Sequence, residues 1–284
     1  MQLSNQSNTA TTLPAQPGID TYDLAENMVE DSSENIPGTS RTTESIKSIW
    51  GLQPRWLLAS LMSVPLVATV FWWLGTRLFD SKLSFFEYHQ FTVLVMGIIA
   101  GGYQLYFWAQ RNNVHLSAKC MKIRLDDQVP FWPRWVWAYS FLYYVMIGLT
   151  VISIQDLADG VHLIFGGLIL LTTGALIFYL YPTNVPESYR HFEIDSLSTR
   201  YLAFIQSMDS NRNAFPSMHC AIATYIGLAI VDLPTIGPWL GYGYIVIIAI
   251  SCVVVKQHVI IDTLAGVGLG AVIFFLNQWL ALVV

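Results

Sequence analysis

Two polar stretches stand at the ends of hydrophobic segments: Asn213–His219, with the sequence NAFPSMH, and Lys256–Asp262, with the sequence KQHVIID. Together they supply two histidines, a lysine and a carboxylate. An ionisable group at membrane depth costs roughly 2.5–3.5 kcal/mol on insertion scales, so such groups mark functional sites in membrane proteins. We therefore interpret the two stretches as parts of one polar site.

Three of these residues have the chemistry of a catalytic set. His258 and Asp262 are four positions apart, so on a helix they share a face. We expect Asp262 to accept a hydrogen bond from one imidazole nitrogen of His258, which leaves the other nitrogen free as a nucleophile. His219 is expected to protonate a leaving oxygen. A lone HxxxD pair is more often a buried polar contact, so this interpretation depends on the whole group of residues.

The neighbouring residues favour an anion as the ligand. Pro216 suits the first turn of a helix, and Ser217 and nearby amides would then face an anion at the positive end of the helix dipole. Lys256 is expected to neutralise phosphate charge, with Arg190 or Arg212 as a second cation. A lysine at the end of a span is ordinarily an interfacial anchor. Taken together, the residues predict phosphoryl transfer through a phosphohistidine.

The composition places this site in a membrane. Of 284 residues, 54% are hydrophobic and 12% are charged, about half the charge of an ordinary soluble domain. The pattern predicts an all-α, polytopic transmembrane helical bundle. In the last hydrophobic segment, Gly266, Gly268 and Gly270 favour close packing against a neighbouring helix. About seven spans are expected, over Trp56–Phe79, Phe86–Gln110, Trp135–Ile154, Val161–Tyr181, Pro216–Val231, Trp239–Val255 and His258–Leu282.

The hydrophobic region forms one domain, over residues 56–284, behind a polar segment. Residues 1–45 are rich in Ser, Thr, Asn, Asp, Glu and Pro, so they bury too little apolar area to order, and we predict a disordered tail. The three cysteines Cys120, Cys220 and Cys252 show no paired spacing, and the last two are predicted to be buried, inert thiols.

The charge pattern predicts sidedness. With seven spans, the N-terminus and every second connection share one side, and the polar stretches open onto that same side. Setting aside Arg190, Arg200, Arg212 and Lys256, that side carries eight basic residues and the other carries only Arg77 and Lys82. The positive-inside rule then predicts that the face with the polar site is cytoplasmic. The eight residues are Arg41, Lys47, Arg55, Arg111, Lys119, Lys122, Arg124 and Arg134.

The two stretches also resemble the motifs of a known family. Phe215–His219 resembles the second motif, P-S-x-H, of the type-2 phosphatidic acid phosphatase superfamily, and Ser251–Asp262 resembles its third motif, S-R-x5-H-x3-D, in register. The spelling KQH at Lys256–His258 is similar to the branch of inositol-phosphorylceramide synthase-like and sphingomyelin synthase-like proteins. The motif-level likeness covers about residues 181–270.

This resemblance implies a mechanism and a fold. His258 would be the nucleophile, Asp262 its orienting partner and His219 the general acid. The last six spans would form a six-helix core, and no metal would be required. Members of the family often work on the outer face of the membrane, which conflicts with the charge pattern.

The chain departs from the family pattern at two motifs. Cys252 stands where the third motif has arginine, and Lys256, one helical turn further on, is expected to replace it. The first motif, K-x6-R-P, is absent as written. Its nearest counterpart runs from Pro182 to Arg190, and Arg190 is followed by His191 rather than proline.

The function expected from these observations is that of a metal-independent enzyme, a membrane lipid phosphate phosphatase. A lipid headgroup phosphotransferase is the close alternative, in which an alcohol replaces water as the acceptor. A non-catalytic lipid-binding membrane protein is the alternative outside enzymes. The expected partners are a lipid phosphate substrate and the bilayer. No cofactor is expected, and no nucleic-acid motif is present. A transporter is disfavoured, because the polar groups cluster at one interface rather than at the midplane.

Overall fold

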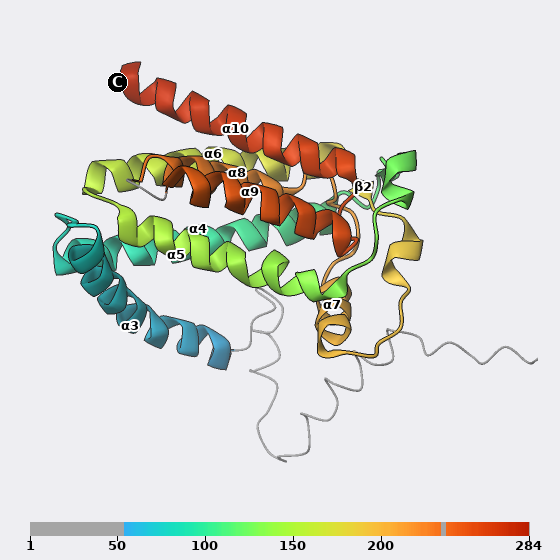
Figure 1. Cartoon of the computed structure of the whole chain (residues 1–284), viewed down its shortest axis with the longest axis horizontal. Helices are drawn as coiled ribbons and strands as arrows, with labels where there is room; N and C mark the ends of the chain where they lie inside the picture. Colours follow the sequence, from blue (N-terminus) through green and yellow to red (C-terminus); the bar gives the residue numbers. More distant parts are fainter. Residues whose placement is uncertain (1–53, 234–236, 284) are drawn as a thin grey trace, which may run out of the picture. The chain divides into compact units, whose positions relative to one another are not determined.

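A computed structural model describes residues 54–233 and 237–283, which lie mainly in helices (Figure 1). The expected tail, residues 1–45, lies outside these residues. The elements in chain order are α3 (Pro54–Leu78), α4 (Phe85–Asn112), β1 (Lys119–Cys120), η1 (Arg124–Asp127), η2 (Pro133–Trp135), η3 (Ala138–Leu142), α5 (Tyr143–Ser153), α6 (Leu157–Leu180), β2 (Thr183–Asn184), η4 (Glu187–Arg190), α7 (Leu197–Ser207), α8 (Met218–Val231), α9 (Gly237–Val254) and α10 (Ile260–Val283).

The predicted all-α membrane bundle is confirmed. Each of the seven hydrophobic segments expected from the sequence coincides with helix. Five helical segments in the described part of the chain are long and apolar enough to cross a bilayer: Phe85–Asn112, Pro133–Ser153, Leu157–Leu180, Gly237–Val254 and Ile260–Val283. The apolar helix α8 is shorter. At 1.5 Å per residue its 14 residues span about 21 Å, less than the ~30 Å hydrocarbon core.

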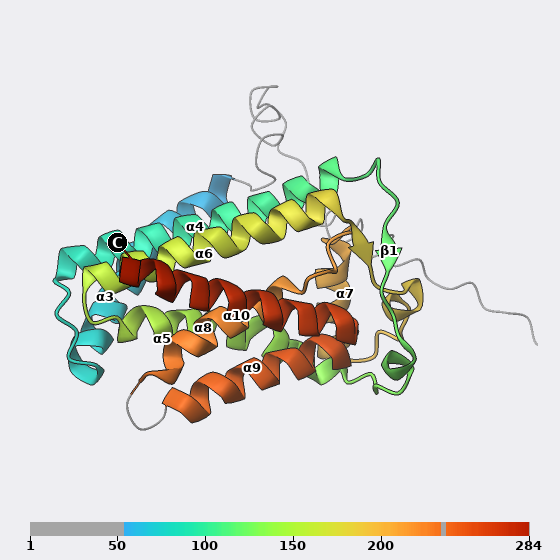
Figure 2. The ribbon, with the colours of Figure 1, turned by 90° about the horizontal axis from the view of Figure 1, so that it is seen from above.

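The short helix α8 lies at the centre of the bundle. It packs most closely against α9 and α10, and it also contacts α5 and α6 (Figures 1 and 2). Eight of its residues are buried: Cys220, Ala221, Ala223, Thr224, Tyr225, Ile226, Gly227 and Ile230. A helix that is apolar on every side must be covered on every side, and the neighbouring helices provide that cover.

The contact between α8 and α10 depends on two glycines. A Cβ atom at Gly266 would overlap the carbonyl oxygen of Ser217, and one at Gly270 would overlap that of Ala221. The backbones of the two helices therefore touch, as small residues allow in membranes. A Cβ at Gly268 would meet nothing within 4 Å, so the predicted packing role is wrong for this residue, which faces outward.

The polar segments of the sequence meet at one end of the bundle. The side-chain amide of Asn113, after α4, donates to the Phe178 carbonyl of α6 at 2.9 Å. The Trp132 amide, before η2, donates to the Val254 carbonyl of α9 at 2.9 Å. The strands β1 and β2 pair in parallel at the same end. The convergence predicted from counting spans is therefore observed.

Helix α7 is an element that the sequence interpretation missed. Ser196 caps it by accepting from the Thr199 amide, and its exposed side chains include Leu197 and Phe204. Its inner face is held by Tyr201, whose ring stacks on Trp137 at a centroid distance of 5.0 Å. Figure 1 shows α7 at the end of the bundle where α5 begins. This helix is amphipathic rather than hydrophobic throughout, so a search for spans passes over it.

Candidate active site

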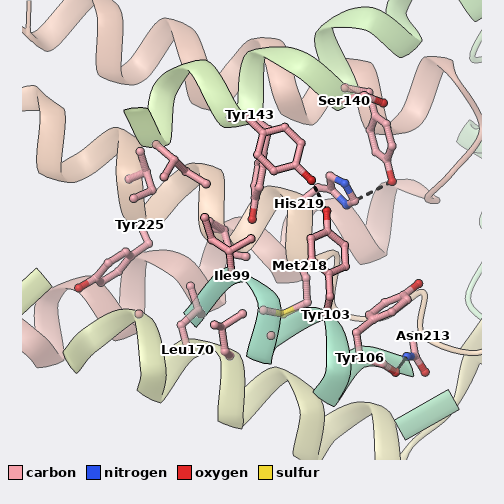
Figure 3. Close-up of a pocket in the computed structure, with 18 of the residues that line it drawn as sticks. Ile99, Tyr103, Tyr106, Ser140, Tyr143, Leu170, Asn213, Met218, His219 and Tyr225 are labelled. Atoms are coloured by element: carbon pink, nitrogen blue, oxygen red, sulfur yellow. Dashed lines mark hydrogen bonds between the residues drawn. The ribbon is translucent and has the colours of Figure 1, made fainter. Parts of the chain in front are cut away.

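A cavity of about 380 Å³ lies between α4, η3–α5, α6 and α8 (Figure 3). Most of its lining is apolar, but one end gathers polar side chains, namely Arg190, Gln206, Asp209, Asn211, Asn213, His219, Gln257 and His258. In the described ranges, no group of three or more His, Cys, Asp or Glu side chains is arranged to hold a metal ion. Of the residues predicted for the site, His219, His258 and Arg190 line this cavity.

The ring of His258 is fixed by two acceptors. Its Nδ1 lies 3.0 Å from the Ala214 carbonyl oxygen and 3.8 Å from Oδ2 of Asp262. A carbonyl oxygen only accepts, so Nδ1 carries a proton and Nε2 has a free lone pair. The hydrogen bond expected from Asp262 is therefore made by Ala214 instead, and Asp262 acts on the ring through charge.

Asp262 occupies the first turn of α10 and is itself buried. Its Oδ2 accepts from the Val259 amide at 3.2 Å, which caps the helix. Burial of His258 is the largest single influence and favours the neutral ring, but the Asp262 carboxylate, with the Cys220 thiol and the Ala214 carbonyl, outweighs burial and raises the pKa of His258 above its ordinary value. Asp262 therefore tunes the protonation of Nε2, while Ala214 fixes the position of the ring.

His219 lies on the opposite wall, in the first turn of α8. Its Nδ1 is 3.2 Å from the Tyr139 hydroxyl, and its ring stacks on the Tyr139 ring at 4.1 Å. Figure 3 shows the ring of His219 beside Tyr143 and Tyr103 at the polar end of the cavity. The tyrosines thus hold the imidazole from one side and leave its other side toward the cavity.

The two histidine rings lie close together on the lining of the cavity. Their centroids are 6.2 Å apart and their planes are tilted by 55°, so one tetrahedral group on the cavity side is within reach of both rings. The spacing is set by the backbone, because the Ser217 amide donates to the Asp262 carbonyl at 2.9 Å. This bond joins the start of α8 to the first turn of α10, and hence His219 to His258.

The structure separates the two candidate arginines. Arg190 lines the cavity, and its Nη2 donates to the carbonyl oxygens of Gln206 and, at 2.9 Å, Asp209. Among the described residues, no carboxylate oxygen lies within 4 Å of its guanidinium. Arg212 lies outside the cavity lining. It donates to the side chain and carbonyl of Asn113 at 2.9 and 2.8 Å, and so fixes the end of α4.

The structure corrects the expectation that Lys256 replaces the missing arginine. Helix α9 ends before Lys256, which adopts a left-handed conformation with φ 59°, while the Gln257 amide donates back to the Cys252 carbonyl. Lys256 and Cys252 therefore share no helix face. The ammonium of Lys256 donates to the carbonyls of Asp126 and Val129 at 3.0 and 2.7 Å, outside the cavity lining. Burial lowers its pKa.

Ser217 also lies apart from the cavity lining. It is fully buried, and its hydroxyl caps α8 by accepting from the Cys220 amide at 3.4 Å. The same hydroxyl lies 3.9 Å from Sγ of Cys252. The predicted helix start is confirmed, but the side chain points to the α9 side rather than to an anion. Cys220 and Cys252 are buried free thiols, as predicted.

Several tyrosines of the site were missed by the sequence interpretation. Tyr103 and Tyr106 come from α4, Tyr139 from η3 and Tyr143 from α5, and all four line the cavity (Figure 3). The spacing of four between Tyr139 and Tyr143, and of three between Tyr103 and Tyr106, places each pair on one helix face. That repeated spacing is the signal that would have found them.

The comparisons with known proteins agree with these motifs. The family model described as the PAP2 superfamily matches residues 126–276, which include both histidines, Asp262 and Arg190. No curated protein matches the chain, and no solved structure matches it.

The two arginines yield a matched pair of variants. We expect Arg190→Gln to weaken inorganic phosphate binding by about tenfold or more, since charge-assisted hydrogen bonds contribute roughly 1.5–3 kcal/mol, and to lower the melting temperature because its bonds to the Gln206 and Asp209 carbonyls are lost. Arg212→Gln should also lower the melting temperature but leave phosphate affinity nearly unchanged. Calorimetric titration and thermal unfolding in detergent measure the two effects. The reverse pattern would contradict the assignment.

Proposed function

The chain belongs to the PAP2 superfamily, and on that premise we propose that it is an integral membrane enzyme that hydrolyses a lipid phosphate through a phosphohistidine. Membership supports a phosphatase or phosphotransferase in general. The long apolar helices agree with a membrane location. The lipid substrate, the covalent intermediate and independence of metal ions are parts of our proposal.

One observation carries the proposal: two histidine rings, 6.2 Å apart, face one cavity, and the Nδ1–H of His258 is held by a carbonyl. That hydrogen bond leaves Nε2 of His258 as the nucleophilic atom. A phosphoryl group between the rings would meet a nucleophile on one side and a proton donor on the other. The positive charge of Arg190 lines the same end of the cavity.

The reaction then follows in two steps. His258 Nε2 attacks phosphorus, the bond from phosphorus to the lipid oxygen breaks, and His219 gives its proton to that oxygen. Water next attacks the phosphohistidine, His219 takes a proton from the water, and the bond from His258 to phosphorus breaks. Asp262 stabilises the positive charge that the His258 ring carries in the intermediate, and Arg190 balances the phosphoryl oxygens.

An alcohol acceptor in place of water would make the enzyme a headgroup phosphotransferase. Two groups of the cavity lining favour this second candidate. Within the described ranges, the hydroxyl of Ser140 and the side-chain nitrogen of Gln206 are buried and have no hydrogen-bond partner. Buried polar groups of this kind need partners, which the hydroxyls of an acceptor alcohol would supply.

We further propose that the polar end of the bundle faces the cytoplasm. The basic residues Lys119, Lys122, Arg124 and Arg134 belong to the segment between α4 and η3 at that end, while Arg77 and Lys82 lie at the other end. The difference in charge supports this orientation by the positive-inside rule.

Phosphate release from a panel of lipid phosphates, with EDTA present, tests the chemistry. We expect His258→Ala to lose activity by roughly a thousandfold or more, because the nucleophile is absent. The exposed His115 supplies a control, and His115→Ala should keep wild-type activity.

Release of phosphate that is undiminished in His258→Ala would overturn the mechanism. If wild type transfers label between lipids without releasing phosphate, the phosphotransferase is correct. If neither occurs, a non-catalytic lipid-binding protein is correct.

The charge of Asp262 should appear in the pH profile. Asp262 raises the pKa of His258, and the nucleophile must be neutral, so Asp262→Asn should move the acidic limb of kcat/KM to lower pH. Because Ala214 still holds Nδ1–H, we expect a loss of only about 10–100-fold in kcat, against ~10⁴-fold where a carboxylate alone fixes the tautomer. The exposed Asp232 gives the control Asp232→Asn, whose limb should stay in place. An unshifted limb in Asp262→Asn would contradict the coupling.

Sidedness can be read with a native thiol. Cys120 is exposed in β1 at the polar end, whereas Cys220 and Cys252 are buried. A membrane-impermeant maleimide should therefore label the protein only when the cytoplasmic side of the vesicles faces outward, and Cys120→Ser should abolish labelling. Labelling from the opposite side would reverse the proposed orientation.

A further inference from the structure

The cavity extends from the two histidines into the bundle as an apolar arm. Away from the polar end, its walls are aliphatic side chains of α4, α5 and α6, among them Val95, Ile98, Val151, Leu163, Ile164 and Leu171. Two polar side chains of the lining are satisfied within the protein there. Thr150 donates to the Met146 carbonyl, and Tyr225 donates to the Leu163 carbonyl. These two side chains therefore need no hydrogen bond from a ligand, and the surface they share with the aliphatic residues suits an apolar ligand.

The cavity is deep. Helix α6 lines it from Leu163 to Phe178, which is about 22 Å at 1.5 Å per residue. Half of the ~30 Å hydrocarbon core is about 15 Å, so the cavity, from its polar end to the end of the arm, is longer than one leaflet is thick. A ligand that fills it must be long and apolar, with its polar group at the histidine end.

The cavity lining is exposed between α4 and α5, near the polar end. Tyr103 of α4 and Tyr144 of α5 both line the cavity, both are more than two-fifths exposed, and their hydroxyls are hydrogen-bonded to each other. Helix α4 packs mainly on α3 and α6, whereas α5 packs on α8 and α3. A lipid chain in the bilayer therefore meets the cavity at the seam between α4 and α5.

We propose that the arm binds one long hydrocarbon chain of the substrate and that Gly167 determines how long a chain is accepted. This rests on the proposed function, because it names the apolar part of that lipid phosphate. Gly167 lines the cavity, and a Cβ atom there would meet nothing within 4 Å. In contrast, a Cβ at Gly166 would overlap Tyr225 and Asn277, and one at Gly174 would overlap Met218. Of these three glycines, Gly167 is the one whose Cβ position is open.

The position of Gly167 along α6 determines which chain lengths reach it. It precedes Gly174, which packs on the neighbour of His219, by seven residues, or about 10 Å along α6. A short chain anchored at the histidines ends before this level, but a long chain passes it. A larger side chain at Gly167 therefore shortens the arm without touching the polar end.

A chain-length series tests the proposal in protein reconstituted into phosphatidylcholine vesicles. With butyl and hexadecyl phosphate as substrates, we expect Gly167→Leu to lower kcat/KM for hexadecyl phosphate by about tenfold or more and that for butyl phosphate by less than about twofold. Gly97 is an exposed glycine of α4 with nothing within 4 Å of its Cβ, so Gly97→Leu is the matched control and should change neither value. Equal losses for both chains, or none, would overturn the role of Gly167.

A binding measurement separates this proposal from the proposed function. Hexadecyl phosphonate, which cannot be hydrolysed, should bind wild type at least about tenfold more tightly than it binds Gly167→Leu, and butyl phosphonate should bind both alike. If no alkyl phosphate is hydrolysed but this difference holds, the enzyme assignment fails and the arm stands. If hydrolysis occurs but both phosphonates bind both proteins alike, the arm fails and the enzyme assignment stands.

Discussion

One backbone hydrogen bond, from the Ser217 amide to the Asp262 carbonyl, holds the candidate site together. It joins the start of α8 to the first turn of α10 between two buried residues, where a buried amide left without a partner costs about 1–3 kcal/mol. Gly266 and Gly270 let the two backbones approach closely enough to form it. His219 follows Ser217 by two residues and His258 precedes Asp262 by four, so the bond fixes both rings relative to one cavity. Helices α4, α5, α6 and α7 supply most of the remaining walls of that cavity.

Much of this fold could be predicted because bilayers constrain sequences strongly. A span needs about 20 apolar residues; the seven hydrophobic segments of the sequence all coincide with helix, and five helical segments in the described part of the chain are long enough to cross. Counting them also placed the polar stretches at one end. Helix α7 was missed because its apolar residues occupy one face only, and the central position of α8 was not predicted, because hydrophobicity gives no order of packing.

The placement of the candidate site residues that share a local motif spacing was predicted correctly. The prediction failed where a residue's position depends on where a helix ends and how the chain continues. The histidines and Asp262 carry motif spacing, and their side chains converge. Lys256 was assigned by a helical spacing that the end of α9 interrupts, and its ammonium serves the loop after η1 instead. Arg190 and Arg212 are both cations near helix ends, so only the folded chain distinguishes the one that lines the cavity. Tyr139 comes from a third segment, and no pairwise spacing links it to His219.

Arg190 has a second role. Its guanidinium donates to the carbonyls of Gln206, in the last turn of α7, and of Asp209 just beyond it, so it is the C-terminal cap of that helix. The outer face of α7 exposes Leu197 and Phe204. The folding of α7 and the position of the cation on the cavity lining are therefore linked equilibria, and the exposed apolar face of α7 would tie both to the bilayer interface. A bilayer whose interface accommodates α7 more readily would keep the guanidinium of Arg190 in place for a larger fraction of the time. The packing of the lipids would then change the affinity of the cavity for an anion.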